Sequence, residues 1–161
     1  MDDSPESKVY VITGPRGSGK TALLSSLKND FKAKGFLTVD LNVHRNMEEQ
    51  FASKLYENGK MYKLFLKPEF SFSFHGLQFS IKGKTDVSDV DSLIGIMLNY
   101  LKKKGIKDLV TMDDVSLTEG MKSFIYSYQQ MVREGYSVFP LMTGLYESVS
   151  KIEQSKSLTF F

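Results

Sequence analysis

The sequence predicts an α/β protein in three layers, with helices on both faces of a mainly parallel β-sheet. Short apolar runs typical of buried strands alternate with longer stretches whose apolar residues recur at helical spacing. A glycine-rich loop joins the first of these strands directly to the first helix. The chain has 161 residues, of which 41% are hydrophobic and 25% are charged, and this is enough for one globular domain over residues 1–161.

The first elements follow from local patterns. An apolar strand is predicted at residues 9–13, and a helix follows over residues 19–34 and stops at Gly35. A second strand is predicted at 38–43. Residues 46–49 have the form of a capping box, which predicts the start of a short helix.

Residues 62–83 interrupt the alternation with a predicted β-hairpin insertion. Apolar and polar residues alternate on both sides of His75-Gly76, which is typical of a hairpin with a two-residue turn. The predicted pairs are Phe74 with Leu77, Phe72 with Phe79, and Phe70 with Ile81. This register places all six side chains on one face, which packs either on a helix of the same domain or on a partner.

The alternation then resumes. A helix over residues 88–104 is predicted to end at Gly105, with three lysines in its last turn. Their charge suits the negative end of the helix dipole, and a nucleic-acid patch is the less favoured interpretation. A third parallel strand is predicted within residues 106–115. A capping box at 116–119 opens a helix that stops at Gly135.

Three further elements complete the prediction. Residues 137–142 form a fourth strand, although Pro140 is unfavourable inside a parallel sheet because it cannot donate to the ladder. A short helix is predicted at about 146–154. Residues 157–161 have the composition of a fifth strand.

The loop after the first strand carries the strongest functional signal. Its sequence fits G-x-x-x-x-G-K-[ST], the Walker A motif or P-loop, and it has the strand and helix that the motif requires on either side. Glycines permit a tight turn whose amides face phosphate oxygens, and the helix N-terminus adds partial positive charge. Lys20 is expected to neutralise the β- and γ-phosphates, and Thr21 to offer its hydroxyl to Mg²⁺. The predicted nucleotide-binding residues are Gly14, Pro15, Arg16, Gly17, Ser18, Gly19, Lys20, Thr21 and Ala22.

A second acidic motif follows the third strand. The apolar run before Asp113 and Asp114 has the form of a Walker B strand. Mg²⁺ prefers one or two carboxylates with water and phosphate oxygens, so Asp113 is a predicted metal ligand together with Thr21. Asp114 is the predicted general base, facing the attacking water. The alternative is a strand that ends in an acidic turn, and the upstream Walker A motif disfavours it.

Cysteine usage and the termini bear on the compartment. The chain has no cysteine, which excludes disulfides, thiolate zinc sites and a cysteine nucleophile. The N-terminal residues 1–6 are acidic and polar, unlike a signal peptide, and no apolar run is long enough to span a bilayer. We therefore expect a cytoplasmic protein without membrane contact.

These motifs resemble those of the AAA+ and STAND P-loop ATPases, and most closely the archaeal-type ATPases of bacteria and archaea. The resemblance rests on residues 13–21, on residues 110–115, and on a strand that ends in Met142-Thr143-Gly144. It implies a P-loop NTPase fold with the strand order 5-1-4-3-2, and Thr143 as a polar sensor of the γ-phosphate or the attacking water. The chain departs from the family at Asp114, where glutamate is usual, and we expect no C-terminal lid domain within it.

We therefore expect an ATP-binding, Mg²⁺-dependent ATPase core that acts as a nucleotide-controlled switch, with ATP or ADP as its nucleotide. The alternatives are a nucleotide-binding module without significant hydrolysis, a small-molecule kinase and a DNA-associated ATPase. Six lysines against two glutamates between residues 54 and 84 would give the last of these a weak nucleic-acid contact. No NKxD-type guanine motif is visible, which favours adenine. A protein partner, or domains beyond this core, is also expected.

Overall fold

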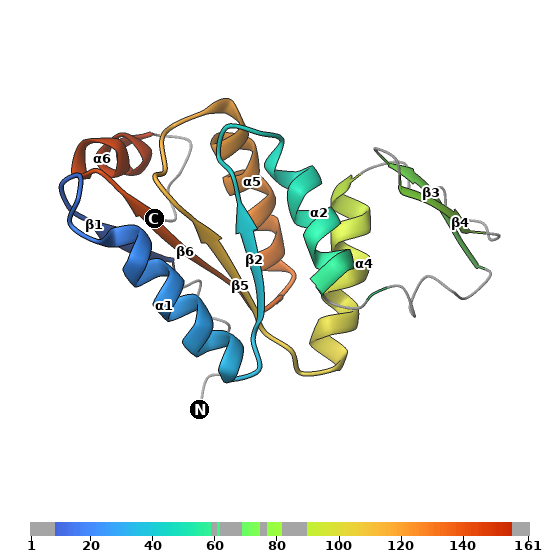
Figure 1. Ribbon diagram of the computed structural model, residues 1–161. Coiled ribbons are helices and arrows are strands. Elements are labelled where there is room, and N and C mark those ends of the chain that lie inside the picture. Colours follow the sequence, from blue (N-terminus) through green and yellow to red (C-terminus); the bar gives the residue numbers. More distant parts are fainter. Residues whose placement is uncertain (1–8, 59–60, 62–68, 75–76, 82–89, 156–161) are drawn as a thin grey trace.

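The structure is a computed structural model that describes residues 9–58, 61, 69–74, 77–81 and 90–155. Strands and helices alternate along the described chain, as predicted (Figure 1). The elements are β1 (Tyr10–Thr13), α1 (Lys20–Ala33), β2 (Leu37–Leu41), α2 (Met47–Asn58), β3 (Glu69–Phe74), β4 (Leu77–Ile81), α4 (Val90–Lys103), β5 (Asp108–Met112), α5 (Glu119–Arg133), β6 (Val138–Gly144) and α6 (Tyr146–Gln154).

The main sheet is parallel throughout and has the strand order β1-β6-β5-β2. This confirms the α/β class and the predicted order of the first four strands. The described part of this sheet has four strands where five were expected, because the predicted fifth strand at 157–161 lies outside the described residues. All strands run the same way, so their carboxyl ends, where parallel sheets place ligands, meet at one edge.

Two apolar clusters hold the helices against the sheet. On one face, Leu24 of α1 packs on Leu109 and Leu141 of the two central strands. The larger cluster joins α2, α4, α5 and α6 to the other face. Within it the rings of Phe51 and Phe124 meet edge to face, with centroids 5.9 Å apart and planes at 88°. The sheet is thus covered on both sides, and its two strand-end edges carry the loops.

The three predicted glycine stops are confirmed. Gly35, Gly105 and Gly135 follow α1, α4 and α5 and have φ values of 88°, 67° and 73°. After each, the next residue donates its N–H to a carbonyl five residues earlier, as Phe36 does to Phe31 at 3.1 Å. This is the Schellman arrangement, which needs a left-handed residue that glycine adopts without steric cost.

The helix starts agree only in part with the predicted capping boxes. Asn46 caps α2 as predicted, since its side chain accepts the N–H of Glu49 at 3.1 Å. The cap of α5 is Thr118, not Ser116, which was wrongly predicted to open the box. The Thr118 hydroxyl accepts the N–H of Met121 at 3.0 Å and donates to the Val43 carbonyl at 2.7 Å. This second bond, to the loop after β2, favours Thr118 over Ser116.

Pro140 lies in a central strand, and the hydrogen-bond pattern explains how. The carbonyls of Ser137 and Thr143 both accept from the β5 side, so alternation along β6 turns Pro140 toward β1. The β1 ladder begins one residue higher, where Tyr10 pairs with Leu141. The nitrogen of Pro140 therefore lies below the level at which β1 begins, and the ladder described between β1 and β6 loses no hydrogen bond.

The inserted hairpin is confirmed as an antiparallel pair, β3 with β4, separate from the main sheet (Figure 1). Two predicted pairs are present, Phe74 with Leu77 and Phe72 with Phe79. The third was wrong, because a register shift before Ser71 pairs Ile81 with Glu69 instead of Phe70. The predicted apolar face of this hairpin lies outside the described side chains. In the part of the chain that the structure describes, no helix could cross a membrane.

Candidate functional site

The loop of residues 14–21 links β1 to α1 at the carboxyl edge of the sheet. Gly17 and Gly19 are left-handed, with φ values of 76° and 85°, and Gly19 caps the helix. A Cβ on Gly14 would come within 2.9 Å of the Ser18 hydroxyl. Gly17 and Gly19 therefore allow the left-handed backbone of the loop, and Gly14 allows its close approach to Ser18. Together they keep the loop over the N-terminus of α1.

The ammonium of Lys20 closes this loop. Its Nζ donates hydrogen bonds to the carbonyl oxygens of Gly14 at 2.8 Å and Pro15 at 2.7 Å. The Ser18 N–H also donates to the Pro15 carbonyl, at 3.3 Å. The charge of Lys20 is therefore held inside the loop by neutral acceptors, without a carboxylate partner among the described residues.

The Thr21 hydroxyl reaches across the sheet edge to Asp113. Its Oγ1 donates to Asp113 Oδ2 at 2.7 Å, which joins the start of α1 to the turn after β5. A hydroxyl and a carboxylate are oxygen ligands that suit Mg²⁺. No cluster of three or more His, Asp or Glu side chains in the described ranges could hold a metal by itself. The donor set therefore fits a Mg²⁺ ion that takes its other ligands from phosphate and water.

Beneath Asp113, Thr143 organises the turn. It is fully buried, its hydroxyl donates to Asp113 Oδ1, and it accepts the Asp114 N–H at 3.1 Å. The Thr143 carbonyl accepts the N–H of Val115 at 2.8 Å. Asp114 has a φ of 51°, a left-handed conformation that is uncommon outside glycine. Side chain and backbone of Thr143 thus fix both the Asp113 carboxylate and the strained residue beside it.

A pocket of about 560 Å³ opens over these groups. It brings together seven residues of the loop and helix start with both acidic residues. Its lining is Arg16, Gly17, Ser18, Gly19, Lys20, Thr21, Ala22, Asp113, Asp114 and Leu145. Of the other predicted residues, Gly14 and Pro15 bind Lys20 from below, and Thr143 is buried beneath Asp113.

Sequence reasoning missed two contributors to this site. Leu145 lines the pocket, and its position directly after the strand that ends at Gly144 was the only available signal. A Cβ on Gly144 would lie 3.0 Å from methyl groups of both Val115 and Val149. Gly144 therefore allows the end of β6 to pack closely between the turn after β5 and α6.

A second connection between α1 and the sheet was also missed. Lys28 lies two turns after Thr21, and its Nζ donates to Asp40 Oδ2 at 2.8 Å. Asp40 also accepts the Thr111 hydroxyl. Burial raises the pKa of Asp40, but the bonds from Lys28 and Thr111 and the charge of Lys54 outweigh this and lower the pKa below its ordinary value. The network helps to hold α1 at a fixed height on β2 and β5.

The lysine-rich segment predicted to contact nucleic acid is described only in part. Lys54 donates to the Asp40 carbonyl. The other five lysines, at positions 60, 63, 67, 82 and 84, lie outside the described residues.

Comparisons with known proteins bear on the fold and the family of the chain. The chain is similar in fold to the ORC2 protein of Aeropyrum pernix, solved in ADPNP–ADP complexes, with a TM-score of 0.56 and 12% identity. That match covers 95% of this chain and 38% of the ORC2 chain, so the chain spans well under half the length of that protein. No curated protein matches significantly. A family model described as an ATPase domain predominantly from Archaea matches residues 3–147. The chain therefore belongs to this family of archaeal-type ATPase domains, and it is a nucleotide-binding P-loop ATPase domain.

Proposed function

We propose that the chain binds ATP and ADP together with Mg²⁺ and hydrolyses ATP as a nucleotide-controlled switch. The bond between Thr21 and Asp113 carries this proposal, because it joins the end of the Walker A loop to the first Walker B acid at 2.7 Å. The ORC2 protein, similar in fold, was solved with ADPNP and ADP, which supports adenine nucleotides as the ligands.

The proposed roles follow from position. The loop amides and the N-terminus of α1 would receive the phosphates. Lys20 would exchange its two carbonyl acceptors for phosphate oxygens, which are stronger partners because they are charged. Thr21 and Asp113 would hold Mg²⁺, which when bound would neutralise charge on the phosphate oxygens.

We propose that Thr143 serves the site through Asp113. Its hydroxyl is already committed to Asp113 and to the Asp114 N–H, and it is fully buried. These contacts favour orientation of the metal-binding carboxylate over the direct contact with the γ-phosphate or water expected of a sensor.

Asp114 is the proposed base that orients or deprotonates the attacking water. It is exposed at the pocket, beside the proposed metal ligand. Its side chain is one methylene shorter than the glutamate usual in related ATPases, and this favours one alternative, a nucleotide-binding module without significant hydrolysis. Release of phosphate from Mg·ATP by the wild-type chain, and its loss in Asp114→Asn, would decide for hydrolysis.

One further part of the proposal concerns the compartment. The absence of cysteine fits a reducing compartment, and we propose the cytoplasm.

Calorimetric titration with Mg·ADP tests the proposal. Wild-type protein should bind, and Lys20→Ala should bind at least about tenfold more weakly, because hydrogen bonds from charged groups contribute about 1.5–3 kcal/mol. Lys151→Ala, an exposed lysine of α6, is the matched control and should bind like wild type. If folded wild-type protein does not bind, or if both variants bind equally, the proposal is wrong.

A further inference from the structure

Three helices end at the edge of the sheet opposite the nucleotide pocket. The C-termini of α1, α4 and α5 lie together at the lower end of the molecule in Figure 1. Backbone bonds join the loops that follow them: Leu37 N–H donates to the Lys107 carbonyl, and Asp108 N–H to the Ser137 carbonyl, both at 2.9 Å. We call residues 30–37, 102–108 and 133–137 the basal edge.

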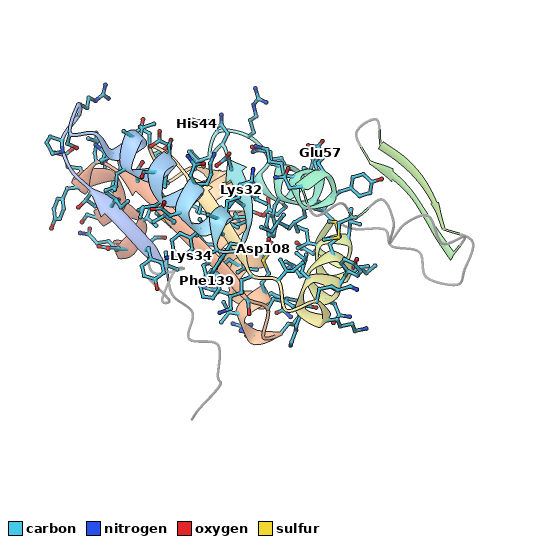
Figure 2. All side chains as sticks on the ribbon, turned by 60° about the horizontal axis from the view of Figure 1, so that its bottom comes forward. Lys32, Lys34, His44, Glu57, Asp108 and Phe139 are labelled. Atoms are coloured by element: carbon cyan, nitrogen blue, oxygen red, sulfur yellow. The ribbon has the colours of Figure 1, made fainter. Side chains whose placement is uncertain are left out.

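The basal edge is strongly basic. Its seven cations are Lys32, Lys34, Lys102, Lys103, Lys104, Lys107 and Arg133, and its three acids are Asp30, Asp108 and Glu134. The formal charge of this small region is therefore +4, although the whole chain carries only +2. Figure 2 turns this edge toward the viewer and labels Lys32, Lys34 and Asp108. The net positive charge of the basal edge is thus larger than that of the whole chain.

Helix dipoles account for only part of this charge. Each helix C-terminus is equivalent to about half a negative charge, so three termini offset about 1.5 charges. The net charge of the basal edge is +4 with Asp108 counted as ionised, which is larger than this offset. Burial raises the pKa of Asp108 well above its ordinary value, which reduces its share of the negative charge further.

No ion pair between described residues neutralises any of the seven cations. The ion pairs among the described residues are Lys28–Asp40 and Lys122–Glu119, and neither involves the basal edge. Four of its lysines instead extend over aromatic rings, with nitrogen-to-centroid distances of 5.6 to 5.9 Å. These contacts are Lys34 on Phe31, Lys102 on Tyr136, Lys104 on Tyr100 and Lys107 on Phe36. Such contacts position the ammonium groups while leaving their charge available to an anion.

The chemistry of the edge selects one class of polyanion. Protein interfaces are depleted in lysine and enriched in arginine, whereas six of the seven cations here are lysines. The large exposed hydrophobic residues of the described chain are Tyr10, Leu23, Tyr126 and Tyr146, so none lies at this edge to anchor it in a membrane. Its aromatic rings lie under lysines, which disfavours stacking of single-stranded bases.

We propose that the basal edge binds the phosphate backbone of duplex nucleic acid without regard to sequence. The lysines of residues 30–37 and 102–108, with Arg133 beside them, would contact successive phosphates and release their counterions. This surface lies at the opposite edge of the sheet from the nucleotide pocket and shares no residue with it. Its binding does not depend on the function proposed above.

Fluorescence anisotropy of a labelled random-sequence DNA duplex, measured over increasing NaCl, tests this proposal. The test variant is the triple substitution Lys32→Glu, Lys103→Glu and Lys107→Glu. The matched control is Arg45→Glu, Lys122→Glu and Lys151→Glu, which changes the net charge equally but lies away from the basal edge. The basal variant should bind at least about tenfold more weakly, with a log–log salt slope smaller by about three, because each phosphate contact contributes about 0.9.

The control variant should stay within about threefold of wild type, and Lys20→Ala should bind duplex like wild type. Circular dichroism should show that all variants are folded. Three outcomes would overturn the proposal: wild-type protein that does not bind duplex at low salt, equal losses in both triple variants, or binding only to vesicles that contain anionic lipid.

Discussion

The hydroxyl of Thr21 and the carboxylate of Asp113 are 2.7 Å apart, although 92 positions separate them in the chain. The contact exists because β1 and β5 run parallel on either side of β6, so the loop after β1 and the turn after β5 open at the same edge. The fold alone therefore brings together two groups that suit Mg²⁺.

Replacing Thr21 should separate metal binding from nucleotide binding. Thr21→Ala removes the hydroxyl, and the gain in ADP affinity that Mg²⁺ provides should fall about tenfold or more. Thr21→Ser keeps the hydroxyl and should retain most of the gain. Titrations of both variants with ADP, with and without Mg²⁺, measure this. An unchanged Mg²⁺ effect in Thr21→Ala would show that this hydroxyl is not a ligand.

Thr143 should contribute to stability and to metal affinity at the same time. In Thr143→Val the shape is kept, but Asp113 Oδ1 loses a donor and the Asp114 N–H loses an acceptor. We expect a loss of about 1–3 kcal/mol in the free energy of unfolding and weaker Mg²⁺-dependent ADP binding. Thr143→Ser should restore most of both. If urea unfolding changes but Mg²⁺ affinity does not, the role of Thr143 is structural only.

Asp108 should make the protein less stable as pH rises. Its side chain is 1% exposed, one carboxylate oxygen has no hydrogen-bond partner, and burial raises its pKa well above the ordinary 3.8. Below that ordinary value both folded and unfolded states are protonated. Between it and the raised pKa the folded state binds more protons, so linkage lowers the stability as pH increases.

Asp108→Asn should remove this dependence and raise the free energy of unfolding at neutral pH by roughly 1–3 kcal/mol. Urea unfolding of both proteins from acidic to neutral pH measures the difference. If the free energies of unfolding of the two proteins differ by the same amount at every pH in this range, the predicted titration of Asp108 is wrong.

Two glycines in helices should respond to alanine in opposite directions. A Cβ on Gly120 would lie 2.9 Å from the Arg45 carbonyl, so Gly120→Ala must move backbone, and we expect a loss of about 1–3 kcal/mol. In Gly95→Ala the nearest atom is the Tyr136 hydroxyl at 4.0 Å. Helix propensity should then dominate and stabilise the protein by about 0.5–1 kcal/mol. Thermal unfolding of the two variants should move in opposite directions, and shifts of the same sign would refute this comparison.

Features set by local sequence could be predicted. The glycine stops at Gly35, Gly105 and Gly135 depend on backbone conformation alone. The loop of residues 14–21 could be predicted because its motif lies within eight consecutive residues. Features set by distant partners could not. The capping box at 116–119 was predicted from the sequence, but the choice of Thr118 as the cap involves its bond to the distant Val43 carbonyl.

The same reason explains what was missed in the candidate site. The link from Lys28 to Asp40 depends on how far α1 reaches along β2, and the register shift before Ser71 depends on the hairpin backbone. Leu145 lines the pocket only because β6 ends beside β1, where Thr13 pairs with Gly144. None of these relationships produces a periodic pattern in the sequence.

Pro140 acts as a register stop for the nucleotide loop. If β1 moved two residues toward the basal edge, the Tyr10 carbonyl would face the proline nitrogen, which has no hydrogen to donate. The observed register places Thr13, the last residue before the loop, level with Gly144. Pro140 therefore helps to fix the position of Lys20 and Thr21 relative to Thr143 and Asp113, because its nitrogen could not bond to β1 in the shifted register.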